Sequence, residues 1–455
     1  MRKLSLLLAL PALLLAIWDM QWYDPNHWSA PFYNDGRWGL DVTVGSGVAG
    51  GSWPRPLRNF YVFGAGLWVG GIVDGDTLVS VGYNPNTGGT EMCPTLCRYW
   101  RGGYSNMLDR IYRYPGDWPP SHSRFPMAPL WELSDMDMWT GCSDSDPAMH
   151  DSFNRPLGVD VYVTVDAYGD SLGSDFFFLR YELANRSGRT LDSLYVGPVL
   201  DADVGTASDD LTGLILDHLF HVGPDTIRVR NTGFAYDYNN VENPGQTWES
   251  GTPGAVAVML LEAQGGLGLA SFKRLELGGD PVTDPQRYLV MAGYDFVTRE
   301  YAPYDSLDLM PGDKRFVMCS GPFSLLPDSV ATFWYAVIGS PFGEQGQPPE
   351  DRDTSELALR CKWARDYFER LTGVTEETPS AEVRAPNCGP TVIRNVLFLP
   401  VSLFTLHSSL FDMTGRKVQE LKSGANDLLQ QAPGAYFVRS AVGGQRSTWK
   451  VVIQR

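Results

Sequence analysis

Histidine, cysteine and positive charge are scarce in this chain of 455 residues. It has 6 histidines and 6 cysteines, and 36 Lys and Arg residues stand against 53 Asp and Glu residues, which gives a net charge of −17. A chain this acidic repels phosphate groups, so we expect no nucleic acid partner. His218 and His221 lack a His-Glu-x-x-His pattern, and Cys93 and Cys97 have no second pair at zinc-ligand spacing. Zinc is therefore not expected, and a Cys93–Cys97 disulfide is the favoured alternative.

Sequence signatures of enzymes are also missing. There is no Gly-x-Ser-x-Gly nucleophile elbow. The glycines at positions 64, 66, 70 and 71 lie in strand-like sequence, where they indicate close backbone packing rather than a phosphate-binding loop. A glycoside hydrolase needs only two carboxylates, and sequence spacing does not reveal them when they come from different strands. We therefore name no catalytic residue and favour a non-catalytic protein.

The longest apolar run lies at the N-terminus. Met1-Arg2-Lys3 precedes a run over residues 4–16 that only Ser5 and Pro11 interrupt. The run is shorter than the roughly 20 residues that span a bilayer, so it predicts a cleaved signal peptide at residues 1–18. An uncleaved anchor or a lipoprotein is the alternative. We expect an extracellular or outer cell-surface protein with no transmembrane segment in the mature chain.

Short strands separated by many turns are predicted for the body, residues 19–373, which has room for two subdomains. The alternation Val-Asp-Val-Tyr-Val-Thr-Val-Asp over residues 159–166 predicts a strand with two different faces. Other strand-like stretches lie at residues 60–69, 77–81, 176–183, 191–200, 255–261, 288–291 and 329–338. Residues 91–156 have a loop-like composition, and residues 18–41 are expected to form an irregular arm. The fold class is mainly β, with a large antiparallel β-sandwich as the body.

One helix is predicted at the end of the body. Apolar residues recur there in alternating steps of four and three, which places them on one helical face. They are Leu357, Cys361, Ala364, Phe368 and Leu371. Asp353 and Glu356 resemble a capping box, and Gly373 is expected to end the helix. We expect it to pack against the sandwich, before a polar linker at residues 374–384 and a small immunoglobulin-like β-sandwich at residues 385–455.

Two groups of aspartates are the candidates for a binding site. The first group is Asp201, Asp203, Asp209, Asp210 and Asp217. The second, weaker group is Asp135, Asp137, Asp144 and Asp146. Carboxylates close together repel one another, and oxygen ligands at flexible spacing suit calcium, the only cofactor we expect. The alternative is that these aspartates cap turns in solvated loops.

Several segments near the C-terminus resemble a known family. They are FDMTGRKV at residues 411–418, GAND at 424–427, PGAYFVR at 433–439 and KVVI at 450–453. Residues 385–455 are similar to the C-terminal (type A) sorting domain of type 9 secretion system cargo. The resemblance implies that an outer-membrane translocon recognises these residues and that the cargo is released or attached to the cell surface. By pattern alone, the same domain fits a passive spacer equally well.

The body resembles an uncharacterised β-rich module of secreted proteins that carry this sorting domain. The segments concerned are SDMDMW at residues 134–139, DSDP at 144–147, FLRYELAN at 178–185 and DADVG at 201–205. The resemblance brings no activity with it. The function we favour is a secreted or surface-displayed, non-catalytic β-sandwich protein.

A concentration of tryptophan in the N-terminal third favours an alternative function. These residues are Trp22, Trp28, Trp38, Trp53, Trp100, Trp118, Trp131 and Trp139. Exposed rings beside paired carboxylates would suit a carbohydrate-binding or glycoside hydrolase-like exoprotein with a polysaccharide or cell-envelope ligand. Burial of the rings under long loops is the simpler expectation, because large aromatic side chains dominate core burial.

Overall fold

The computed structural model describes residues 18–44, 47–94, 109–123, 125–150, 155–372, 391–393, 396–399, 408–412, 416–421, 424–428, 430–442 and 445–453. The chain divides into two compact units, Met1–Glu376 and Glu377–Arg455. The division falls within the predicted linker at residues 374–384. That linker, and residues 1–17 of the predicted signal peptide, lie outside the described residues.

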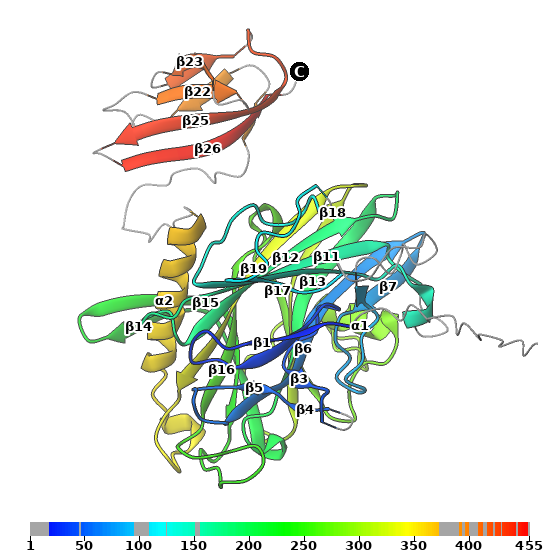
Figure 1. Ribbon diagram of the computed structural model, residues 1–455, viewed down its shortest axis with the longest axis vertical. Coiled ribbons are helices and arrows are strands. Elements are labelled where there is room, and N and C mark those ends of the chain that lie inside the picture. Colours follow the sequence, from blue (N-terminus) through cyan, green and yellow to red (C-terminus); the bar gives the residue numbers. More distant parts are fainter. Residues whose placement is uncertain are drawn as a thin grey trace, which may run out of the picture. The chain divides into compact units, whose positions relative to one another are not determined.

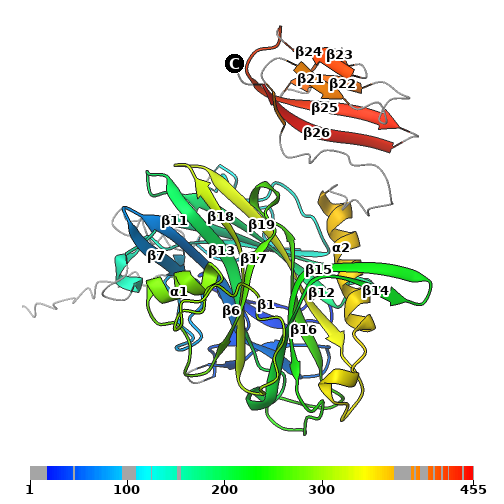
Figure 2. The same ribbon diagram turned by 180° about the vertical axis from the view of Figure 1, so that it is seen from behind.

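The larger sheet of the first unit has 9 strands in the order β14-β15-β16-β19-β12-β11-β10-β8, with β9 paired to β10. All of its pairings are antiparallel. The strands are β8 (Cys93–Pro94), β9 (Tyr112–Tyr114), β10 (Met136–Ser143), β11 (Val159–Ala167), β12 (Phe176–Asn185), β14 (Asp210–Val222), β15 (Asp225–Asp237), β16 (Gly254–Glu262) and β19 (Val330–Pro341). The long β14–β15 hairpin extends past the helix α2 (Ser355–Thr372) in both views (Figures 1 and 2).

The smaller sheet has 6 strands in the order β17-β18-β13-β6-β5, with β7 paired to β6. They are β5 (Gly51–Ser52), β6 (Phe60–Val73), β7 (Asp76–Val81), β13 (Leu191–Ala202), β17 (Leu269–Glu276) and β18 (Lys314–Leu325). Two further antiparallel pairs join β1 (Met20–Tyr23) to β2 (Ala30–Tyr33) and β3 (Leu40–Asp41) to β4 (Val48–Ala49). The body is therefore a mainly β, sandwich-like structure, as the sequence predicted.

The main hydrophobic core combines residues of both sheets. The four valines of β11 enter it together with Phe177 and Leu179 of β12, and Leu67, Val69 and Phe316 come from the smaller sheet. The predicted alternation on β11 is confirmed, but its polar face is not solvated. Asp160 and Asp166 are fully buried, because aromatic residues of the 112–139 region, including Trp139, pack over that face beside Tyr162.

Two helices cover the outer faces of the sandwich. The predicted apolar stripe of α2 packs on the larger sheet against Phe178 and Trp334, and Asp353 Oδ1 accepts a hydrogen bond from Ser355 N at 2.8 Å. The predicted helix and its packing against the sheet are confirmed. The predicted capping box is not formed, because the helix begins at Ser355, two residues after Asp353, and Glu356 Oε2 accepts a hydrogen bond from Arg360 Nη1 at 2.6 Å. Gly373, the predicted end of the helix, lies outside the described residues. The helix α1 (Asp284–Met291) packs on the smaller sheet through Val290 and Met291.

Three local predictions were wrong. Residues 18–41, predicted as an irregular arm, contain β1, β2 and β3, and β1 pairs with β2. Residues 288–291 are helical, because Pro285 lies in the first turn of α1 and the Gln286 side chain accepts a hydrogen bond from Thr283 N at 3.1 Å. Residues 91–156, predicted as loop, contain β8, β9 and β10. All eight residues of β10 are buried, so this strand lacks the alternation that marks a half-exposed strand.

The second unit is also made of strands. A 5-stranded sheet has the order β20-β26-β25-β22-β23, and β21 pairs with β24. The strands are β20 (Thr391–Ile393), β21 (Val396–Leu399), β22 (Ser408–Asp412), β23 (Lys417–Leu421), β24 (Gly424–Asp427), β25 (Gly434–Val442) and β26 (Gln445–Ile453). Leu410, Leu421, Tyr436, Val438 and Ile453 are buried in a core of their own.

Most described thiols are packing residues. Cys142, Cys319 and Cys361 are buried free cysteines, and burial raises the pKa of the Cys361 thiol to about 12. Cys97 lies outside the described residues, so the predicted Cys93–Cys97 disulfide stays a prediction. Among the described residues, no helix has the length and apolar character needed to cross a membrane.

Candidate cation site

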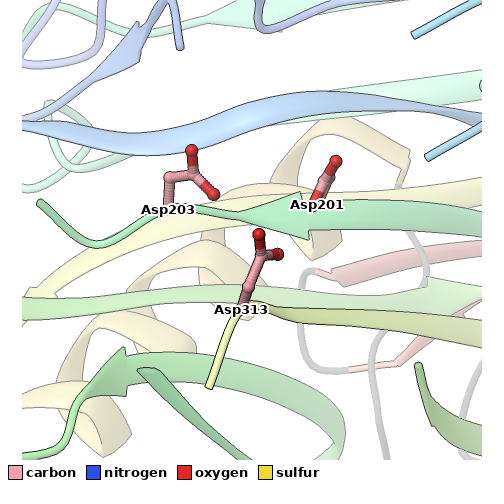
Figure 3. A group of neighbouring side chains, drawn as sticks. All are labelled: Asp201, Asp203 and Asp313. Atoms are coloured by element: carbon pink, nitrogen blue, oxygen red, sulfur yellow. The ribbon is translucent and has the colours of Figure 1, made fainter. Parts of the chain in front are cut away.

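Asp201 and Asp203 of the first aspartate group lie near Asp313, a residue distant in sequence. One oxygen of each carboxylate lies within 4.8 Å of the others. Asp201 is the second-last residue of β13, and Asp313 directly precedes β18, the neighbouring strand (Figure 3). Antiparallel pairing of β13 and β18 therefore brings the three side chains together.

The positive charge of one guanidinium group already lies beside the triad of Asp201, Asp203 and Asp313. Arg315 Nε lies 2.9 Å from Asp201 Oδ1, and Arg315 Nη1 lies 3.1 Å from Asp313 Oδ1. Tyr83 donates a hydrogen bond to Asp201 Oδ2 at 2.6 Å. Burial raises the pKa of Asp201 well above its usual range and that of Asp203 to about 7. A metal ion here would have to compete with the nearby charge of Arg315.

Asp209 belongs to a different cluster, with Asp237 and Glu242. Ligand oxygens of these three residues also lie within 4.8 Å of one another. Asp209 ends the short 3-10 helix Ala207–Asp209, Asp237 ends β15, and Glu242 lies in the loop that follows β15. The cluster is held together because β14 and β15 pair Asp210 with Asp237.

This second cluster contains carboxylate oxygens without a partner. Asp237 Oδ2 and Asp209 Oδ1 are buried and accept no hydrogen bond. The neighbouring Asp210 is also fully buried, with Oδ2 bonded to Val204 N at 2.9 Å and Oδ1 unpartnered. Burial raises the pKa of Asp237 to about 7, and the charges of Asp209 and Glu242 add to that rise. Within the described residues, none of these carboxylates forms an ion pair with Lys, Arg or His.

Asp217, also in the predicted calcium group, lies apart from these clusters on the β14–β15 hairpin. Its carboxylate accepts hydrogen bonds from Arg228 Nε at 2.7 Å and Nη2 at 2.5 Å, which lower its pKa. His218 and His221 lie on the same strand, opposite Val229 and Thr226. Three residues apart on a strand, the two histidines point to opposite faces and do not make a joint metal site.

The carboxylates of the weaker group accept hydrogen bonds from backbone N–H groups instead. This group consists of Asp135, Asp137, Asp144 and Asp146. Asp137 accepts hydrogen bonds from Leu133 N at 2.6 Å and Ser134 N at 3.0 Å. Asp144 accepts from Leu157 N and Val159 N, both at 2.7 Å. Asp135 Oδ2 accepts from Gly169 N, and Asp146 caps the 3-10 helix that starts at Pro147. The turn-capping alternative thus describes the contacts of this group, but Asp137 and Asp144 are fully buried and do not lie in solvated loops.

Asp237, Glu242, Asp313 and Arg315 were not among the predicted site residues. A signal existed for the first two, because the run Asp-Tyr-Asn-Asn-Val-Glu at residues 237–242 places oxygen ligands at short spacing after a strand. Asp313 had no such signal, since only the pairing of β13 with β18 brings it near Asp201.

A separate hollow lies beside the β3–β4 pair. One cavity of about 680 Å³ is bordered by Val48, Arg58 and Trp248. A second, of about 360 Å³, is bordered by Trp22, Arg55 and Arg58. Arg58 and Phe60 border both cavities, so the two adjoin, and we refer to them together as the groove. Trp22 is 37% exposed at its edge, whereas Trp28, Trp38, Trp53 and Trp139 are buried. Trp100 lies outside the described residues.

No family model matches this chain, and no curated protein matches it. Among solved structures, 42 chains match. One is a polysaccharide lyase, with a TM-score of 0.23 and 7% sequence identity, and the alignment covers 96% of this chain and 46% of the lyase chain. The chain thus spans about half the length of that structure, and at this TM-score the likeness carries no information about function.

Proposed function

We propose that this chain is an exported, non-catalytic β-sandwich protein that a type 9 secretion system delivers to the cell surface or the medium. The observation that carries the proposal is that the segments resembling the sorting domain belong to one compact unit separate from the body. Residues 411–418, 433–439 and 450–453 contribute to β22, β23, β25 and β26, which are neighbours in one sheet. These segments therefore lie side by side and could be recognised together.

The roles of the acidic side chains in the body support a non-catalytic protein. Asp201 and Asp313 pair with Arg315. Asp137 and Asp144 accept backbone N–H groups. Each of these carboxylates therefore has a structural role, in contrast to a general acid or base that faces a substrate cavity.

Deletion of residues 385–455 is expected to stop export. In a host with a type 9 secretion system, the truncated body should accumulate in the periplasm, because the segment that the translocon recognises is gone. Cell fractionation followed by immunoblotting measures this. As the matched control, a reporter with the same signal peptide and residues 377–455 at its C-terminus should reach the surface or the medium. Equal export of the full and truncated chains would sink the proposal.

A second candidate function, carbohydrate binding, is favoured by the groove beside β3 and β4. Trp22 offers an exposed ring, and Arg55 and Arg58 offer charge to an acidic polysaccharide. Replacing Trp22 by alanine is expected to weaken retention on such a polysaccharide about tenfold, which corresponds to about 1.4 kcal/mol. Affinity electrophoresis measures retention. Trp131, 62% exposed but outside the lining of this groove, provides the control. If Trp22→Ala and Trp131→Ala behave alike, the groove is not the binding site.

A further inference from the structure

The cluster of Asp209, Asp237 and Glu242 lies where two segments of the chain meet. The first segment is the turn from Gly205 through the 3-10 helix, and the second is the loop after β15. Tyr238 N donates a hydrogen bond to Asp209 O at 2.9 Å, and Thr206 N donates one to Glu242 Oε1 at 2.6 Å. The two segments thus lie close enough to share a ligand.

A second observation, besides the closeness of the three carboxylates, points to a bound ligand: buried carboxylate oxygens there have no hydrogen-bond partner. Asp237 is 0% exposed, and its Oδ2 accepts no hydrogen bond. Asp209 Oδ1 is buried and unpartnered in the same way. An ionised carboxylate buried without a partner is costly, and coordination of a cation removes that cost. Among the described residues, the guanidinium of Arg352 lies close by, but it donates to the backbone carbonyl groups of Asp237 and Tyr238 and forms no ion pair with the three carboxylates, unlike Arg315 at the other triad.

Hydrogen bonds hold the second oxygen of Asp209 and of Asp237 and both oxygens of Glu242. Asn239 Nδ2 donates to Asp209 Oδ2 at 2.6 Å. Val241 N donates to Asp237 Oδ1 at 3.2 Å, and Thr206 Oγ1 donates to Glu242 Oε2 at 3.0 Å. Bonds of this kind orient metal ligands in known sites.

Gly205 makes room for the third carboxylate. Its φ of +70° belongs to the left-handed region, and a Cβ at this position would lie 2.4 Å from Glu242 Cδ. A side chain at position 205 would therefore displace Glu242 from the cluster.

We propose that Asp209, Asp237 and Glu242 bind one calcium ion, which ties the turn before β14 to the loop after β15. All three ligands are hard oxygens, and Ca²⁺ accepts irregular sets of carboxylate, carbonyl and water oxygens. Zinc favours nitrogen and sulfur ligands, and magnesium demands near-octahedral geometry and keeps its waters. The inference does not depend on the proposed export, so either can fail without the other.

Thermal unfolding of the full chain tests the site. After treatment with a chelator, addition of CaCl₂ is expected to raise the unfolding midpoint by at least about 3 °C, because the ion binds only the folded state. The same concentration of MgCl₂ should produce a smaller rise. No rise with CaCl₂ at saturating concentration overturns the proposal.

Two variants locate the ion. Asp237→Asn is expected to abolish the calcium-dependent rise while keeping or increasing the calcium-free midpoint, since it removes a buried unpartnered charge. Asp313→Asn alters the triad that Arg315 balances, and it should retain the full rise. Isothermal titration calorimetry should show one fewer calcium ion bound by Asp237→Asn than by the parent chain. A calcium response that survives in Asp237→Asn, or that disappears in Asp313→Asn alone, assigns the ion elsewhere and overturns the proposal.

Discussion

Replacing Arg315 by methionine is expected to destabilise the body by about 3–5 kcal/mol, because removing one partner of a buried ion pair leaves unpaired charges inside the protein. The Arg315 side chain is 5% exposed, and its guanidinium lies near Asp201, Asp313 and Asp280. Methionine has a similar apolar stem but no charge. Chemical denaturation measures the change in the free energy of unfolding.

The loss is expected to be larger near pH 8 than near pH 5. Burial raises the pKa of Asp203 to about 7 and that of Asp280 to about 6. In the unfolded chain these carboxyls titrate near pH 4, so between about pH 4 and 7 the folded state holds more protons and its stability falls as the pH rises. The charge of Arg315 opposes both pKa rises. In Arg315→Met, the free energy of unfolding therefore falls more steeply as the pH rises.

Arg189→Met is the matched control for Arg315→Met. Arg189 pairs with Asp74 at the surface, where the two side chains are 52% and 66% exposed. Exposed pairs contribute less than about 1 kcal/mol, so this variant should unfold close to the parent. Adding Asp201→Asn to Arg315→Met should recover part of the lost stability at the higher pH. Arg315→Met with parental stability at both pH values would contradict the assigned role.

Replacing Phe177 by alanine is expected to cost about 3–5 kcal/mol, the range for deleting a buried aromatic ring. Phe177 on β12 is fully buried. Its ring centroid lies 4.8 Å from that of Tyr23, 5.5 Å from that of Trp38 and 5.8 Å from that of Trp28. It therefore anchors the N-terminal arm to the sandwich. Denaturation curves should show the loss, and limited proteolysis should show faster cleavage within residues 18–41.

Trp131→Ala provides the comparison, since this large ring is mostly exposed and its removal should change stability by less than about 0.5 kcal/mol. An arm that stays protected from protease in Phe177→Ala would show that other contacts anchor it. These contacts also explain why three of the N-terminal tryptophans are unavailable for sugar stacking: Trp28 and Trp38 pack on Phe177, and Trp53 Nε1 donates to Asp175 Oδ1 at 3.0 Å.

The strands and helix with strong periodicity were predictable from sequence. Residues 159–166 and the stripe of α2 each present one apolar face, and that face enters a core. β10 and α1 were not predictable in the same way. Both faces of β10 are covered, so its residues show no alternation. The helix α1 is short, and its start depends on Pro285 and Gln286 rather than on a long pattern.

The candidate cation site was predictable in part. The abundance of aspartate near residues 201–217 drew attention to the correct region, and Asp209 belongs to the proposed site. Its partners Asp237 and Glu242 follow only after a hairpin reverses the chain and pairs Asp210 with Asp237. Similarly, the charge of Arg315 beside Asp201 depends on the pairing of β13 with β18.

The sequence by itself determined a mainly β protein, an amphipathic helix against its sheet, an excess of acidic over basic residues and the region in which the chain divides into two units. These properties follow from local composition and periodicity, which act over a few neighbouring residues. The tertiary structure alone decided which aspartates are neutralised by arginine, which accept backbone N–H groups and which stay buried without a partner. Those differences arise from strand pairing between distant residues, because a carboxylate's environment depends on the groups within a few ångströms in space rather than on its neighbours along the chain.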